Sequence, residues 1–189
     1  MNFNSPIILA SKSPRRQELL REAGYTFEVV SLETDESFPD SIPKKAVAEY
    51  IAKQKIKPFR DKYNDTLVIT ADTTVLIAEE VLGKPSSYNE AMEMIMKLSN
   101  EVHSVITGVC LLWKGELKSF SEETLVSFEQ VSEEEADFYI KTKKPYDKAG
   151  AYGIQEWIGL TKIKWIKGDY YNVVGLPVAK LYDTINNLL

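Results

Sequence analysis

The strongest constraint on the fold is the alternation of short apolar segments with helix-start signals near the beginning of the chain. Ile7–Ala10 is apolar, branched and too short for a helix, so it predicts a buried strand. Ser13 then stands as a candidate N-cap and Pro14 as the first residue of a helix that Gly24 would end. Thr66–Thr70 is a second apolar run and predicts a central strand. Strands that alternate with helices are typical of α/β proteins.

Antiparallel pairing is expected in the second half of the chain. Residues 102–113 and 117–130 predict two paired strands around the turn Lys114-Gly115-Glu116. The remaining expected elements are a strand over 27–31, a helix over 43–59, a hairpin over 75–82, a helix over 90–98 capped by Asn89, a helix that begins with the capping box of Ser132 and Glu135, a strand-like last third with glycine turns, and a closing helix over 177–188. This order predicts an α/β or α+β chain with a mixed sheet, in a single domain over residues 1–189 without a linker.

Charge and cysteine content exclude several classes of protein. The net charge of −5, from 23 Lys and Arg against 28 Asp and Glu, argues against nucleic-acid binding through overall charge. Cys110 is the one cysteine, which excludes an internal disulfide, and His103 is the one histidine, which excludes multi-His zinc sites. The longest stretch without a charged residue has 12 residues, too few to span a membrane. We therefore expect a cytoplasmic protein without membrane or nucleic-acid partners.

The turn between the first strand and the first helix has the residues of an anion site. Ser11 and Ser13 supply hydroxyls beside the free N–H groups of a helix start, where anions bind favourably. Arg15 and Arg16 add two guanidiniums, which match phosphate geometry. Because arginines in a first turn oppose the helix dipole, a bound anion would explain them. The alternative is an ordinary N-cap followed by exposed arginines.

Carboxylates form a second set of candidates. Asp72 follows the central apolar strand, and the carboxyl end of such a strand is where α/β folds place their sites. It is a candidate metal ligand or general base, and the alternative is a turn residue that caps Thr73 or Thr74. Asp35-Glu36 lies in an acidic loop after the second strand, at the same end if the sheet is parallel there. The alternative for this pair is a solvated loop.

Two lysines and an amide complete the list. Lys84 lies between Gly and Pro in a stiff turn, whereas Lys55, on the predicted helix over 43–59, is a weak candidate alone. Gln155 ends a segment of small residues and offers both a donor and an acceptor, which suits recognition of a nucleobase edge. No P-loop, dinucleotide fingerprint or nucleophile elbow is present. Arginines, lysines, carboxylates and an amide together favour a nucleoside triphosphate held with a divalent metal.

These segments also occur, in the same order, in the Maf family. The matching segments are SKSPRR, the DE of ETDES, AKQK, TADT, GKP, HSVITGV, DKAGAYGIQ and GDYYNVVGLP. The resemblance runs from about Ile7 to the C-terminus. It implies a metal-dependent nucleoside triphosphate pyrophosphatase that cuts between the α and β phosphates. It also implies an elongated mixed α/β fold, similar to inosine triphosphate pyrophosphatases, with a central sheet flanked by helices and a cleft between two lobes.

The resemblance assigns expected roles by position. The residues expected to bind substrate are Ser11, Ser13, Arg15, Arg16, Lys55, Thr73, Lys84 and Gln155. Asp72 matches the catalytic aspartate that accepts a proton, and Glu36 with Asp72 is expected to bind Mg²⁺ or Mn²⁺. Arg15, Thr73 and Gln155 follow the pattern of the subfamily that prefers dTTP and UTP. The GIQ segment departs from the usual pattern in being followed by Glu156-Trp157.

Three further expectations follow. The resemblance links the family to septum formation, so the alternative function is a non-catalytic nucleotide-binding regulator of that process. CTP or modified pyrimidine triphosphates are further candidate substrates. An exposed edge at Trp157-Ile158 would permit a homodimer.

Overall fold

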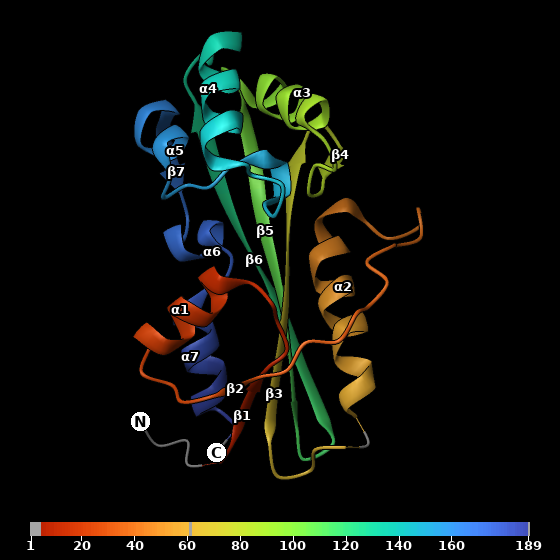
Figure 1. Cartoon of the computed structure of the whole chain (residues 1–189). Coiled ribbons are helices and arrows are strands. Elements are labelled where there is room, and N and C mark those ends of the chain that lie inside the picture. The colour runs from red at the N-terminus through yellow and green to blue at the C-terminus, as the bar shows by residue number, and fades with distance from the viewer. Residues whose placement is uncertain (1–4, 61, 189) are drawn as a thin grey trace. The chain divides into compact units, whose positions relative to one another are not determined.

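The computed structural model describes residues 5–60 and 62–188, and its centre is a mixed sheet of seven strands (Figure 1). The strand order is β2-β1-β3-β5-β6-β7, and β4 pairs with β3. The strand β1 is parallel to both β2 and β3, whereas β4 and β7 are antiparallel to their partners. The strands are β1 Ile7–Leu9, β2 Glu28–Val29, β3 Leu67–Ile77, β4 Glu80–Leu82, β5 Val102–Trp113, β6 Glu116–Phe128 and β7 Ile163–Lys167. The predicted mixed α/β fold with a central sheet flanked by helices is confirmed.

The chain divides into two compact units. Unit 1 comprises residues 1–72, 107–122 and 175–189, and unit 2 comprises residues 73–106 and 123–174. The helices are α1 Pro14–Glu22, α2 Val47–Ile56, α3 Tyr88–Leu98, α4 Glu133–Lys143, α5 Trp157–Lys162, α6 Tyr170–Val174 and α7 Val178–Asn186, with short 3₁₀ turns at Lys44–Ala46, Lys57–Phe59 and Ala149–Ala151. Among residues 5–60 and 62–188, no helix is long and apolar enough to cross a membrane.

Unit 1 has helices on both faces of its strands, with α1 and α7 on one side and α2 on the other (Figure 1). Because side chains of a strand alternate between faces, β1 contributes side chains to the apolar clusters on both faces of the sheet. Leu9 packs with Leu20 of α1 and Leu181 of α7, whereas Ile8 packs with Ala52 and Ile56 of α2. Each of these side chains is at most 3% exposed. The two apolar clusters therefore fix α1 and α2 to the same strand.

Unit 2 has one apolar cluster, formed by its strands and helices α3 and α4. Ile95 of α3 and Tyr139 of α4 are fully buried there, and Phe128 of β6 is 2% exposed. Met92 and Met96 of α3 pack against the same cluster, so the helical spacing of this Met-rich segment serves core packing. The helix α4 begins with the predicted capping box.

Several predicted boundaries are wrong. The strand β3 does not end before Asp72 but continues to Ile77, because its last three residues pair with β4 and Val75 and Ile77 pack in the apolar cluster of unit 2. The cap of α3 is Ser87, whose hydroxyl accepts from the Glu90 amide, and not Asn89. The strand-like last third holds one strand, β7, and the helices α5 and α6 instead. The expected exposed edge at Trp157-Ile158 is absent, since Ile158 is fully buried.

Gly108 of β5 determines how closely α2 approaches the sheet. A Cβ atom at this position would lie 2.2 Å from the backbone nitrogen of Glu49 and 2.4 Å from the carbonyl carbon of Ala48. Both contacts are with backbone, so a side chain could be accommodated only if the helix moved. Glycine at position 108 therefore allows α2 to pack directly on the sheet.

Gly108→Ala should lower the free energy of unfolding by about 3 kcal/mol, because the added methyl overpacks a contact between two backbones. Gly83→Ala is the matched control, since a Cβ there meets nothing within 4 Å. Chemical denaturation of both variants would test this. Equal stability of the two variants would contradict the close approach of α2 to β5.

His103 of β5 is a buried histidine of unit 2. Its ring is 2% exposed and lies edge-on to the rings of Phe128 and Tyr152. The Nε2 atom lies 2.7 Å from the Tyr152 hydroxyl. Burial lowers the pKa of His103 from its ordinary value to about 3. The folded protein therefore keeps this ring neutral where the unfolded chain protonates it.

This difference predicts acid sensitivity. Because the folded pKa of His103 is below the unfolded one, its contribution to stability is lost as the pH falls from about 6.5 towards 3. The slope it adds is at most about 1.4 kcal/mol per pH unit. Denaturation of the wild type and His103→Phe at several pH values should give a flatter profile for the variant. Parallel profiles would contradict a buried neutral His103.

Candidate active site

The strand-to-helix turn of unit 1 brings the two predicted serines together. Ser11 follows β1 and is 7% exposed. Its Oγ accepts a hydrogen bond of 3.3 Å from the Ser13 amide. Ser13 is the N-cap of α1, as predicted, and its hydroxyl accepts from the Arg16 amide at 3.5 Å. The turn thus places two hydroxyls at the start of a nine-residue helix, where the helix dipole is positive.

Arg16 connects this turn with two other segments of unit 1. Its Nε donates to the Gly175 carbonyl at 2.8 Å, and its Nη1 donates to the Ala71 carbonyl at 2.9 Å and to Ser11 Oγ at 3.4 Å. Burial lowers the pKa of the guanidinium, and the negative charge of Asp72 opposes that effect. Arginine nevertheless stays charged in proteins. Arg16 is therefore a fixed cation beside the residue that precedes Asp72.

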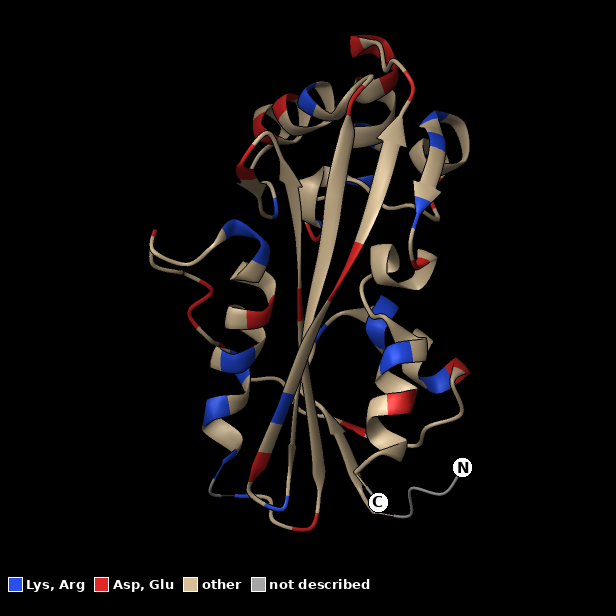
Figure 2. Cartoon of the chain, turned by 180° about the vertical axis from the view of Figure 1, so that it is seen from behind, with Lys and Arg blue, Asp and Glu red and all other residues tan. Residues whose placement is uncertain are grey.

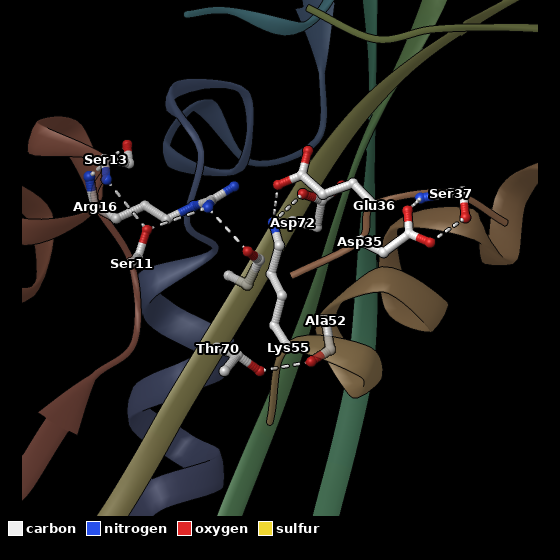
Figure 3. A network of polar contacts seen from close by, with 11 residues as sticks. Ser11, Ser13, Arg16, Asp35, Glu36, Ser37, Ala52, Lys55, Thr70 and Asp72 are labelled. Atoms are coloured by element: carbon white, nitrogen blue, oxygen red, sulfur yellow. Dashed lines mark hydrogen bonds and ion pairs between the residues drawn. The ribbon is translucent and has the colours of Figure 1, made fainter. Parts of the chain in front are cut away.

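Lys55 of α2 lies between the two predicted carboxylates (Figure 3). Its Nζ is 2.7 Å from Asp72 Oδ1 and 2.8 Å from Glu36 Oε1. The side chains of Lys55 and Asp72 are 14% and 9% exposed, whereas that of Glu36 is 45% exposed. One ammonium thus brings together carboxylates from β3 and from the acidic loop, and the weakest candidate lysine occupies the centre of the group.

The register between α2 and β3 explains this placement. The Thr70 hydroxyl donates to the Ala52 carbonyl at 2.8 Å (Figure 3). Thr70 and Asp72 share one face of β3, and Ala52 and Lys55 share one face of α2, because these spacings match the two periods. The hydrogen bond between Thr70 and Ala52 therefore brings Asp72 and Lys55, the next residues on these faces, into contact. Figure 2 shows basic residues on both α1 and α2, the helices that supply Arg16 and Lys55.

The two residues of the acidic loop differ in what they contact. Asp35 is held locally, since its carboxylate accepts from both the amide and the hydroxyl of Ser37 at 2.8 Å. These bonds lower the pKa of Asp35. Glu36 instead reaches across to Lys55. Glu36 is therefore the member of this pair that joins the site.

Three of the remaining predicted residues belong to unit 2, and the fourth belongs to unit 1. Thr73 follows Asp72 in β3 and is partly buried, while Lys84 and Gln155 are both exposed. The loops of Lys84 and Gln155 are connected, because the Gly150 amide donates to the Gly83 carbonyl at 3.0 Å. Arg15, on α1 of unit 1, is partly buried.

One polar group close to Gln155 was not predicted from the sequence. In unit 2, Glu156 forms an ion pair with Lys148 and accepts a hydrogen bond from Tyr139, next to Gln155. The DKAGAYGIQ segment contains Lys148. From the sequence, its small residues predicted only that a ligand could approach the backbone there, and nothing singled out Lys148. Tyr139 is a helix residue 17 positions before Glu156, so no local pattern connects them.

The Arg16 contacts predict a stability difference between two arginines of α1. Arg16→Lys should lower the free energy of unfolding by about 1–3 kcal/mol, because an ammonium cannot reproduce the bonds to both carbonyls. Arg21→Lys is the control, since Arg21 is exposed and lies over the Phe27 ring, a contact that lysine also makes. Urea denaturation would compare them. Equal losses would contradict a fixed Arg16.

Eight curated relatives at 43–48% identity carry the same name. A protein of Phocaeicola vulgatus named dTTP/UTP pyrophosphatase is 48% identical over 184 residues, which cover 96% of this chain and 95% of that protein. A protein of the same name from Cytophaga hutchinsonii is 44% identical, with coverage of 98% and 85%. Among solved structures, that of the Staphylococcus aureus Ham1 protein is similar at a TM-score of 0.46 and 15% identity, over 65% of this chain and 71% of that one.

The family comparison covers almost the whole chain. The model described as Maf-like protein matches residues 6–188. This range includes the Ser11–Arg16 turn, Glu36, Lys55 and Asp72, and it extends through the segments of unit 2. Together with relatives at 43–48% identity, the match shows that this chain belongs to the Maf family.

Proposed function

We propose that this chain hydrolyses dTTP and UTP to the nucleoside monophosphate and pyrophosphate. The relatives that carry this activity in their names support the reaction class. The observation that carries the proposal is the group of Lys55, Asp72 and Glu36 beside the fixed cation Arg16, all within unit 1. Cations and carboxylates packed this closely suit a site that binds a polyanion through its cations and hydrolyses it with the help of a carboxylate.

The cationic residues would bind the triphosphate. Ser11 and Ser13 present hydroxyls at the start of α1, and Arg16 adds a guanidinium there. Lys55 would neutralise further charge from the opposite helix, and we assign Lys84 of unit 2 the same role. The positive end of α1 favours phosphate at this turn. Each group would become more effective as the nucleotide displaces water.

Asp72 is the proposed general base. Its carboxylate accepts a hydrogen bond from Lys55, which fixes its orientation, and its side chain is 9% exposed. A water molecule that attacks phosphorus must lose a proton, and a carboxylate held near it would accept that proton while pyrophosphate leaves. Lys55, which contacts Asp72 directly, would orient the carboxylate and stabilise the negative charge that develops on the phosphates.

A divalent cation fits the donor set of Glu36 and Asp72. Mg²⁺ in nucleotide enzymes commonly takes one or two carboxylates together with phosphate oxygens and water. Among the described residues, no group of three or more His, Cys, Asp or Glu side chains could hold a metal. The substrate would therefore have to complete the coordination of Mg²⁺ or Mn²⁺. Such an ion would withdraw charge from the phosphates.

Base recognition is assigned to Arg15, Thr73 and Gln155. Gln155 is exposed and carries both an amide donor and an acceptor. Thr73 follows Asp72 in β3, where successive side chains lie on opposite faces, so its assignment rests on the family pattern and not on contact with Asp72. These residues support a preference for thymine and uracil over other bases.

Asp72→Asn should lower the rate of dTTP hydrolysis by roughly 10²–10⁴-fold, because it removes the proton acceptor. Asp183→Asn, an exposed change on α7 of the same unit, is the matched control and should retain the wild-type rate. Release of pyrophosphate from a panel of nucleoside triphosphates with Mg²⁺, with and without a chelator, would measure both variants.

The panel also tests the alternatives. Turnover of dTTP and UTP that requires Asp72 and the metal would support the proposal. Binding of nucleotide without turnover would contradict it and favour a non-catalytic regulator. A rate in Asp72→Asn equal to that of Asp183→Asn would remove Asp72 from the chemistry.

A further inference from the structure

The Gln155 side chain projects from a tightly closed turn of unit 2. The Glu156 amide donates to the Gly153 carbonyl at 3.0 Å, which closes a four-residue turn over 153–156. The four residues before Gln155 are all buried, whereas Gln155 itself is exposed. The backbone before Gln155 is therefore buried and closed into a turn, while Gln155 itself is exposed.

A buried tyrosine holds both ends of this turn. The Tyr139 hydroxyl accepts a hydrogen bond of 3.0 Å from the Gly153 amide and donates to Glu156 Oε2. Tyr139 is fully buried on α4. One hydroxyl thus joins the first and last residues of the turn to the core of unit 2.

Lys148 holds the other oxygen of the Glu156 carboxylate. Its Nζ lies 3.1 Å from Glu156 Oε1 and 2.8 Å from Asp147 Oδ1, and its side chain is 9% exposed. A Cβ at Gly153 would lie 3.0 Å from the Glu156 carboxyl carbon and 3.1 Å from Lys148 Cε. The turn backbone therefore packs directly against the ion pair.

Shielding Lys148 and most of the Glu156 side chain from water has a desolvation cost. Ion pairs of this kind often stabilise a fold less than apolar residues would. What a fully bonded polar group does provide is one defined geometry. Here the fixed geometry is that of the turn on which Gln155 stands.

We propose that Tyr139, Lys148 and Glu156 are positioning residues that orient Gln155 to read the imide edge of thymine or uracil. This inference rests on the proposed function. Both bases present an N3–H donor next to carbonyl acceptors, and a glutamine amide offers the complementary acceptor and donor. Cytosine has an acceptor at N3 and an amino group at C4, so a fixed amide would distinguish it. The methyl group of thymine lies away from this edge, so dTTP and UTP would be bound alike.

Glu156→Gln and Tyr139→Phe test the proposal through selectivity. Each should raise the KM for dTTP about tenfold with little change in kcat, because the base is held less well while the chemistry is untouched. The preference for dTTP over dCTP should fall by a similar factor. Glu129→Gln and Tyr146→Phe are matched controls on exposed residues of unit 2 and should behave as wild type.

A double variant separates positioning from a general structural effect. If Glu156 acts through Gln155, Glu156→Gln should have no further effect on selectivity in a Gln155→Ala background. An equal effect with and without Gln155 would overturn the proposal, and so would an unchanged preference in the single variants. Tyr139→Phe removes one oxygen and keeps the ring, so it decides the question if Glu156→Gln does not fold.

Binding of dTMP and dCMP, measured by calorimetry, makes the inference separable from the proposed activity. Preferential binding of dTMP that Glu156→Gln abolishes would support the positioning role even if dTTP were not hydrolysed, in which case only the proposed function fails. Equal binding of the two monophosphates to the wild-type protein would overturn the inference even if dTTP were hydrolysed.

Discussion

The contact of Lys55 with Asp72 and Glu36 is the interaction on which the account of unit 1 depends. A largely buried lysine and a largely buried aspartate require each other, because either one alone would leave an uncompensated charge. Their meeting depends on the position of α2 on the sheet. The hydrogen bond from Thr70 to Ala52 sets the position of the helix along β3, and Gly108 allows the helix to approach closely. Packing around the ion pair therefore places the residues to which we assign the chemistry.

The two units contain similar ion-pair groups, to which we assign different roles. Each contains a shielded lysine between two carboxylates: Lys55 with Asp72 and Glu36 in unit 1, and Lys148 with Asp147 and Glu156 in unit 2. In unit 1 a carboxylate of the group is the proposed base, so we assign Lys55 a role in catalysis. In unit 2 the group is bonded to a turn, so we assign Lys148 a role in positioning that turn. The assigned roles differ because the group in unit 1 lies beside the cation Arg16, whereas the group in unit 2 is bonded to the turn over 153–156.

The Ser13 cap and the capping box of α4 were predicted correctly, because each follows from residues within a few positions of one another. The strand β1 was predicted from its apolar run, although distant strands and helices hold it in place. The last third was predicted incorrectly because its short helices depend on distant contacts. Asn172 of α6 is fully buried and donates to the Val105 carbonyl of β5, a contact that no pattern around α6 reveals.

The candidate site was predictable in composition but not in arrangement. Its residue types predicted phosphate and metal binding, yet the contact of Lys55 with Asp72 depends on the register of α2 on β3, which is a tertiary property.

The most direct test of the central claim is a ³¹P NMR spectrum of the products formed from dTTP with Mg²⁺. The account predicts dTMP and pyrophosphate, from cleavage between the α and β phosphates. The appearance of dTDP and inorganic phosphate instead would contradict it.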